Sequence, residues 1–118
     1  MPAPEKPTQS RGRILVVDDS RFVRGYVAEL LEEAGYYVVQ AEDGATALRR
    51  LETESFDVIV TDLNMPLLDG FAVLETVKPY LPETEFIILT AVDDLSTTVK
   101  AIRMGAYDYL VKPVDNEL

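Results

Sequence analysis

The sequence predicts an α/β domain in which a five-stranded parallel sheet carries helices on both faces. Two observations predict it: short apolar runs rich in β-branched residues recur five times, and segments with helical apolar spacing lie between them. Near-continuous apolar runs are typical of parallel strands buried on both faces. At 118 residues and 47% apolar composition, the chain is the size of one such domain.

The strands are predicted in order along the chain after a polar N-terminal segment. Residues 1–13 contain three prolines among polar residues and lack apolar periodicity, so we expect a flexible arm there. The domain is then expected to span residues 14–118. Its five strands are predicted over residues 14–17, 37–41, 58–61, 86–90 and 109–111.

The segments between the predicted strands have apolar residues at helical spacing. The clearest helix extends from Phe22 to Ala34 and ends at Gly35, because glycine is common just past the last helical residue. Three further helices are predicted at 45–51, from about 71 until just before Pro79, and at about 96–104 before Gly105. Strands and helices therefore alternate with short connections, which is the pattern of a doubly wound sheet.

Among doubly wound sheets we choose the flavodoxin-like order 2-1-3-4-5, which the pattern alone does not fix. Asp115 or Asn116 is a candidate N-cap for a fifth helix, yet the sequence stops at Leu118. We therefore expect that helix to be missing or truncated. A fragment of a longer protein is the favoured interpretation, and cover by another chain is the alternative, because exposed core promotes aggregation.

Composition excludes several classes of function. The 21 acidic and 11 basic residues give a net charge of -10, which disfavours direct contact with nucleic acid or anionic membranes. Cysteine is absent, so disulfides and thiolate metal sites are excluded. No apolar stretch approaches the roughly 18 residues of a membrane span. We expect a cytoplasmic domain whose chemistry uses carboxylates, hydroxyls and lysine, since histidine is also absent.

Polar residues follow four of the predicted strands. Ligands of open parallel sheets bind beyond the carboxyl ends of the strands, where this sequence has Asp18-Asp19, Asp62, Thr90 and Lys112. Three crowded carboxylates repel one another unless a cation or proton neutralises them. Oxygen ligands without histidine or cysteine specify a hard cation, and Mg2+ fits.

Each of these residues also has a simpler interpretation. Asp18, Asp19 and Asp69 could cap helices, as aspartate after a strand often does. Taken alone, Thr90 is more often structural, and Lys112 is more often a solvated surface residue. Their coincidence at one edge of the sheet favours the metal site.

A metal at this edge would favour a bound phosphate. An ionised Asp62 is already a nucleophile and could attack a phosphoryl group without a general base. Lys112 and Mg2+ would stabilise the charge on the phosphoryl oxygens, and Thr90 would donate a hydrogen bond to one of them.

The motifs that carry these residues resemble those of response-regulator receiver domains of two-component signal transduction. The resemblance extends from about Ile14 to the end of the chain. It includes five motifs in order, at 14–19, 58–66, 69–70, 89–91 and 109–113.

The resemblance implies a role for each matching residue. It makes Asp62 the phosphoacceptor and assigns Mg2+ to Asp18, Asp19, Asp62 and the backbone carbonyl of Asn64. Thr90 and Tyr109 become the switch residues, and the Lys112–Pro113 peptide bond is expected to be cis, which aims Lys112 inward. Asn64 and Val92 are positions that tune hydrolysis of the acyl phosphate.

The resemblance also implies partners. A sensor histidine kinase or a phosphotransfer protein would supply the phosphoryl group, and an output domain or effector would respond to it. Phosphorylation would change the surface around the fourth helix and fifth strand. A homodimer is a further partner that the resemblance implies, and the family often dimerises through the fifth helix, which we expect to be missing or truncated here.

Other classes of protein compete with this interpretation. An aspartyl-phosphate phosphohydrolase of the haloacid-dehalogenase type also uses an aspartate and Mg2+, but it requires a second aspartate two positions on, where this chain has Asn64. A nucleotide-binding module is weaker, because the six glycines nowhere match a phosphate-binding loop. A module that has lost phosphorylation would have a damaged acidic set, and here the set is intact.

Overall fold

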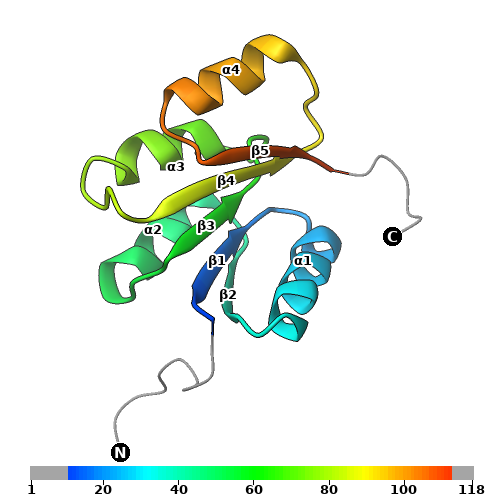
Figure 1. Ribbon diagram of the computed structural model, residues 1–118, viewed down its shortest axis with the longest axis vertical. Coiled ribbons are helices and arrows are strands. Elements are labelled where there is room, and N and C mark those ends of the chain that lie inside the picture. Colours follow the sequence, from blue (N-terminus) through cyan, green and yellow to red (C-terminus); the bar gives the residue numbers. More distant parts are fainter. Residues whose placement is uncertain (1–10, 113–118) are drawn as a thin grey trace, which may run out of the picture.

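A computed structural model gives the structure of the chain and describes residues 11–112. Strands and helices alternate along this stretch, and all strand pairs are parallel (Figure 1). The strands are β1 (Arg13–Val17), β2 (Tyr37–Ala41), β3 (Val58–Thr61), β4 (Glu85–Thr90) and β5 (Asp108–Val111). The helices are α1 (Arg21–Glu33), α2 (Gly44–Thr53), α3 (Gly70–Val77) and α4 (Leu95–Arg103). The sheet order is β2-β1-β3-β4-β5, which confirms the predicted doubly wound fold.

Element boundaries lie within a few residues of the predicted ones. β1, β4 and β5 each begin one residue earlier than predicted, at Arg13, Glu85 and Asp108. The glycines predicted to end α1 and α4 follow those helices directly after one capping residue. Gly35 has φ 102° and Gly105 has φ 108°, a left-handed backbone conformation that glycine adopts without strain.

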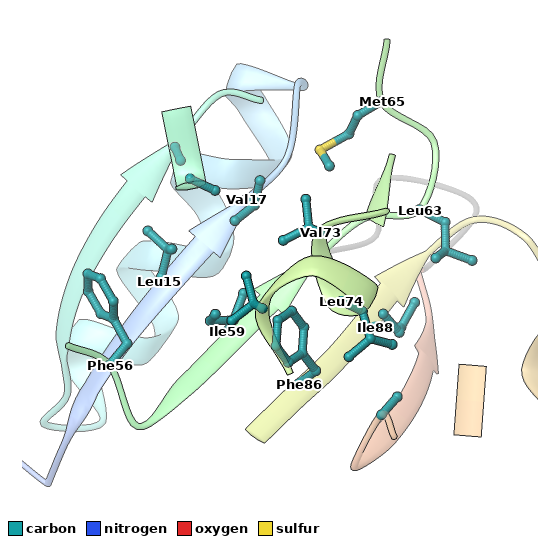
Figure 2. Close-up of a cluster of buried hydrophobic side chains, with 14 of the residues drawn as sticks. Leu15, Val17, Phe56, Ile59, Leu63, Met65, Val73, Leu74, Phe86 and Ile88 are labelled. Atoms are coloured by element: carbon teal, nitrogen blue, oxygen red, sulfur yellow. The ribbon is translucent and has the colours of Figure 1, made fainter. Parts of the chain in front are cut away.

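The two faces of the sheet carry different helices. Alternate residues of β1 point to opposite faces, so Leu15 packs with α2, α3 and α4, whereas Val16 packs with α1. The cluster on the three-helix face is the larger one and contains the largest buried side chains (Figure 2). That cluster includes Phe86, Ile59, Leu74 and Ile88.

Burial on both faces holds for β1 but not for β5. Leu110 and Val111 are 46% and 41% exposed, and Leu89 of β4 is half-buried. Leu110 pairs with Leu89 on the face that carries α1, and among residues 11–112 α1 alone covers that face and lies over β1 and β2. Val111 pairs with Thr90 and points to the opposite face, at the edge of the sheet. An apolar groove of about 270 Å³ remains between α1 and β4. The predicted loss of a fifth helix, with its cap at Asp115 or Asn116, falls outside the described residues, as does most of the N-terminal arm.

Candidate functional site

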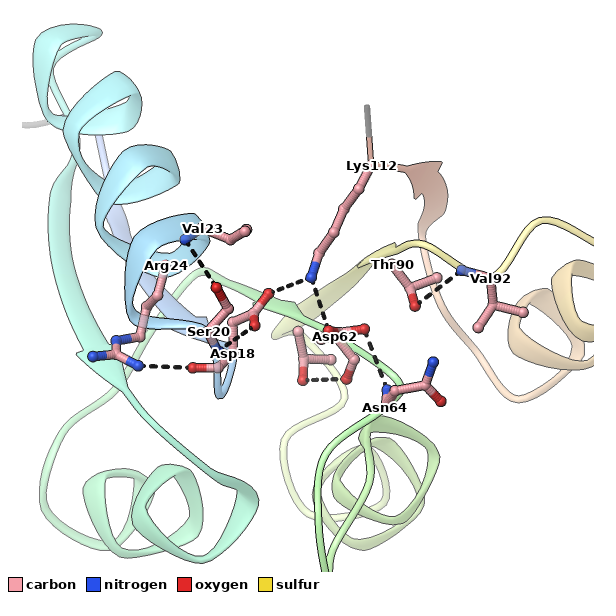
Figure 3. A network of polar contacts seen from close by, with 10 residues as sticks. Asp18, Ser20, Val23, Arg24, Asp62, Asn64, Thr90, Val92 and Lys112 are labelled. Atoms are coloured by element: carbon pink, nitrogen blue, oxygen red, sulfur yellow. Dashed lines mark hydrogen bonds and ion pairs between the residues drawn. The ribbon is translucent and has the colours of Figure 1, made fainter. Parts of the chain in front are cut away.

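Four strands end at one edge of the sheet and place polar side chains there (Figure 3). Backbone pairing continues past the strand ends: the Asp62 N–H donates to the Val17 carbonyl at 3.0 Å, and the Lys112 N–H donates to the Thr90 carbonyl at 2.8 Å. The parallel register therefore fixes the backbone from which each polar side chain starts.

Three carboxylates meet at this edge. Asp18, Asp19 and Asp62 each offer an oxygen, and these oxygens all lie within 4.8 Å of one another. Asp18 and Asp62 are buried, whereas Asp19 is exposed. The Lys112 ammonium lies 2.8 Å from Oδ2 of Asp18 and 2.8 Å from Oδ2 of Asp62. Three carboxylates and one ammonium leave the cluster with two uncompensated negative charges, which suits one divalent cation.

Lys112 remains charged in this cluster. Burial of the ammonium opposes its charge, but hydrogen bonds to Asp18 and Asp62 and the negative charge of both acids outweigh burial, so the pKa of Lys112 is raised. The side chain of Lys112 is only 15% exposed. It is therefore a fixed cation directed into the acidic cluster, in contrast to a solvated surface lysine.

Asp18 has partners besides Lys112. Its Oδ1 accepts a hydrogen bond from the Ser20 N–H at 2.9 Å. Ser20, rather than either neighbouring aspartate, is the N-cap of α1, and its hydroxyl accepts from the Val23 N–H at 3.2 Å. The helix-capping interpretation of Asp18 and Asp19 is therefore wrong. It is correct for Asp69, which caps α3.

Asp62 begins a tight turn after β3. Its Oδ1 accepts from the Asn64 N–H at 3.2 Å, and its backbone carbonyl accepts from the Thr61 hydroxyl at 3.0 Å. Gly70, the first residue of α3, packs so closely that a Cβ there would lie 2.2 Å from the Asp62 carbonyl oxygen. The turn also holds Leu67, fully exposed at φ 70°, a conformation that a leucine adopts only under strain. α3 and this turn together fix the position of the Asp62 side chain.

Thr90 and Tyr109 both contact the backbone of Val92. Thr90 is fully buried, and its hydroxyl accepts from the Val92 N–H at 3.4 Å. The Tyr109 hydroxyl donates to the Val92 carbonyl at 2.7 Å. Burial, followed by the negative charge of Asp94, raises the pKa of Tyr109. The tyrosine is therefore a neutral hydrogen-bond donor at neutral pH.

The predicted site residues differ in how the structure places them. Asp18, Asp19, Asp62 and Lys112 are brought together. Thr90 and Tyr109 meet at the loop after β4, whereas the Asn64 carbonyl as a metal ligand stays a prediction. Pro113, and with it the predicted cis bond, lies outside the described residues.

Two contacts at this edge were not predicted. Arg24 donates to the Asp18 carbonyl, and its second partner is Gln40. The sequence holds no clear signal for such a contact, because a long side chain on a helix has many possible acceptors.

An oxygen-only donor set fits Mg2+, which prefers few carboxylates and completes its shell with water and phosphate. Asp18, Asp19 and Asp62 are the described residues that could hold the ion. In the same stretch of chain, no helix is both long and apolar enough to cross a bilayer.

The chain is similar in sequence to known proteins over most of its length. Residues 14–118 match the model of the response regulator receiver domain. The chain is 42% identical over 103 residues to the transcriptional activator protein IrlR of Burkholderia pseudomallei, and 40% identical over 105 residues to the DNA-binding transcriptional regulator NtrC of Escherichia coli. These matches cover 87% and 89% of this chain but 44% and 22% of those proteins.

A solved structure gives the same result. The chemotaxis protein CheY4 of Vibrio cholerae superposes with a TM-score of 0.81 at 35% identity, covering 87% of this chain and 88% of that one. The fold and the acidic edge are those of a receiver class of signalling domain. The chain belongs to the response-regulator receiver domain family of two-component signal transduction.

Proposed function

We propose that this domain is a Mg2+-dependent switch that accepts a phosphoryl group on Asp62 from a sensor histidine kinase or a phosphotransfer protein. The charge imbalance at the sheet edge supports this proposal: three carboxylates lie together, and the ammonium of Lys112 pairs with two of them. Asp62 follows β3, the central strand, so groups from β1 on one side and from β4 and β5 on the other can reach a phosphoryl group attached to it.

The reaction is an in-line transfer. A carboxylate oxygen of Asp62 forms a bond to phosphorus while the bond from phosphorus to the donor's histidine nitrogen breaks, and that nitrogen keeps the electron pair. Lys112 stabilises negative charge on one phosphoryl oxygen, the Thr90 hydroxyl donates to another, and backbone N–H groups after Asp62 hold the third. Asp18, Asp19, Asp62 and the carbonyl of Asn64 would hold Mg2+, which would supply further positive charge next to the phosphoryl group.

The proposed chemistry stops at the domain's own phosphorylation and dephosphorylation. Asn64 occupies the position where a phosphohydrolase of the haloacid-dehalogenase type has an aspartate that protonates the leaving group. We therefore expect no sustained release of phosphate from p-nitrophenyl phosphate. Repeated turnover that requires Asp62 would favour the phosphohydrolase instead.

The proposed conformational change begins at Thr90 and is passed on to Tyr109. When Asp62 is phosphorylated, Thr90 turns toward the phosphate and Tyr109 moves inward, which changes the surface of α4 and β5. An output domain, an effector or a second copy of the domain would then bind that surface. Because IrlR and NtrC are longer than this chain, the output partner is part of the proposal. We also propose a cytoplasmic location, without direct contact to nucleic acid or membrane.

The test is the intact mass of the protein after treatment with acetyl phosphate and Mg2+. The parent protein should gain one phosphoryl group, and Asp62→Asn should gain none. Asp57→Asn is the matched control, because Asp57 is an exposed aspartate directly before β3, at the opposite end of that strand. Phosphorylation of Asp62→Asn to the parent's extent would overturn the assignment.

A second measurement tests the switch. With Mg2+ and beryllofluoride, the Tyr109 ring resonance, assigned by its absence in Tyr109→Phe, should shift in the parent. The same resonance should stay in place in Thr90→Val, which lacks the hydroxyl. An equal shift in both proteins would show that the response of Tyr109 does not depend on the Thr90 hydroxyl.

A further inference from the structure

Arg24 of α1 joins the turn after β1 to the neighbouring strand β2. Its Nη1 donates to the backbone carbonyl of Asp18 at 2.9 Å, and its Nε donates to the Gln40 side chain at 3.1 Å. Figure 3 shows the guanidinium reaching Asp18 from the side away from Lys112. Arg24 is thus near the acidic cluster but bound to its backbone and not to its carboxylates.

This contact completes the restraint of Asp18. Its N–H donates to the Ala41 carbonyl at 3.2 Å, its carboxylate is held by Ser20 and Lys112, and Arg24 holds its carbonyl. The carbonyl belongs to the peptide bond that leads into Asp19. Fixing this peptide plane sets the direction in which the Asp19 side chain leaves the backbone.

Asp19 depends on its backbone for placement. Within residues 11–112, no hydrogen bond or ion pair holds its exposed carboxylate, although one of its oxygens lies in the acidic cluster. Backbone orientation is therefore the restraint that keeps this oxygen with those of Asp18 and Asp62. A cation site loses affinity when its ligands must be ordered at the moment of binding.

We propose that Arg24 is a positioning residue for the divalent-cation site, acting through the Asp18–Asp19 peptide with Gln40 as its second anchor. The planar guanidinium suits this task because it offers donors in a fixed fork and stays charged. Groups that orient metal ligands commonly change metal affinity by about 10- to 100-fold when removed. The inference rests on the proposed Mg2+ site.

Electrostatics alone predicts the opposite sign. A guanidinium beside a cluster with excess negative charge repels an incoming cation, so removing that charge should tighten Mg2+ binding. Loss of positioning should weaken binding. The direction of the change in affinity therefore separates the two effects.

The experiment measures Mg2+ affinity by titration calorimetry for the parent, Arg24→Gln and Arg21→Gln. Arg21 is the matched control, since it is an exposed arginine on the same helix with no hydrogen bond or ion pair among the described residues. We expect about a 10-fold weaker affinity in Arg24→Gln and an equal or slightly tighter one in Arg21→Gln. Thermal unfolding in EDTA identifies a temperature at which every variant is folded.

A second pair of variants guards against unfolding of Arg24→Gln. Gln40→Met keeps the Arg24 charge but removes an anchor on an exposed position, and should weaken binding two- to fivefold. Arg24→Lys keeps the charge without the fork and should fall between the parent and Arg24→Gln. Unchanged or tighter Mg2+ binding in folded Arg24→Gln or Gln40→Met would overturn the positioning role alone. Absence of Mg2+ binding in the parent would overturn the proposed function itself.

Discussion

The two ends of the sheet handle charge in opposite ways. At the amino end, Arg13 donates to Glu54 at 2.9 Å and to the Ser55 carbonyl at 2.8 Å, and its guanidinium lies 4.6 Å and 5.4 Å from the ring centres of Tyr37 and Phe56. At the carboxyl end, three acids lie together and the ammonium of Lys112 pairs with two of them, Asp18 and Asp62. Charge is paired at one end and left in excess at the other.

Two further charged groups near the amino end, Asp57 and Lys78, also have hydrogen-bond partners. Asp57 accepts from the Arg13 backbone N–H at 2.8 Å, and the Lys78 ammonium lies 2.9 Å from the Thr84 carbonyl and 3.2 Å from Glu85. Partnered charges at the amino end stabilise the fold, whereas the excess negative charge at the carboxyl end costs stability unless a cation binds there. Functional sites are the places where proteins break the rules that stabilise them.

The largest expected change in stability comes from adding a side-chain atom where the carboxyl end of the sheet is tightly packed. In Gly70→Ala, the new Cβ would approach the Asp62 carbonyl oxygen to 2.2 Å, so the backbone must move. We expect a loss on the order of 4 kcal/mol in the free energy of unfolding, at the upper end for overpacking. Urea unfolding in EDTA measures it. The control Gly25→Ala, where the Cβ meets nothing within 4 Å, should gain up to about 1 kcal/mol.

The next largest change in stability comes from removing one lysine ammonium from each end of the sheet. Lys112→Met leaves two buried carboxylates without a counter-charge and should lose about 3 kcal/mol of unfolding free energy. Lys78→Met should lose about 1 kcal/mol, because its partners are mostly carbonyls that water can reach. Urea titrations without Mg2+ check both values. Equal losses would contradict the contrast between the two ends.

The same lysine gives a pH dependence with a defined sign. Since the folded-state pKa of Lys112 is raised, its stabilisation is complete below the unfolded pKa of 10.5 and is lost as pH rises through the folded value. The stability difference between parent and Lys112→Met should therefore be constant from neutral pH to about 10 and shrink above it. A difference that grows at alkaline pH would contradict the assignment.

A smaller effect comes from removing one acid from each end. Asp19→Asn relieves repulsion in the acidic cluster and should gain about 0.5 kcal/mol of unfolding free energy in EDTA. With Mg2+ at about 10 times the dissociation constant of the parent, the parent should instead be the more stable protein. Asp57→Asn should lose about 1 kcal/mol, because it weakens the bond from the Arg13 N–H. Opposite signs in the two urea curves are the predicted result.

The smallest effect concerns an acid at the carboxyl end that is not part of the cluster. The backbone N–H of Thr97 and other local hydrogen bonds lower the pKa of Asp94, the N-cap of α4. Its stabilisation is therefore present above the unfolded pKa of 3.8 and lost as pH falls through the folded value. Asp94→Asn keeps a capping side chain without this titration, so its stability should decline less in acid. Thermal melts between pH 5 and 2 check this.

Much of the fold was predictable because local chemistry and tertiary structure agree. The local signals and the final fold coincide at the glycines that follow α1 and α4 and at the apolar runs of β1 and β3. Partial exposure of β5 was not predictable, because burial depends on which helices cover each face and the strand residues themselves are apolar.

The site was predictable in its acids and its lysine, because parallel strands bring their carboxyl ends to one edge. The Arg24 contact was not, since it depends on how α1 is rotated over β2. The strained backbone of Leu67 was also unpredictable, because leucine gives no signal for a positive φ.

The backbone of Val92 lies between the buried Thr90 and the partly exposed Tyr109. Its N–H is bound by Thr90 and its carbonyl by Tyr109, so the two peptide groups of a single residue join the interior of the sheet to its surface. Replacing the Val92 side chain leaves both bonds available, whereas shifting the main chain by one register position removes both. The length of the loop after β4, more than the identity of its residues, therefore determines whether Thr90 and Tyr109 can both bond to the same residue.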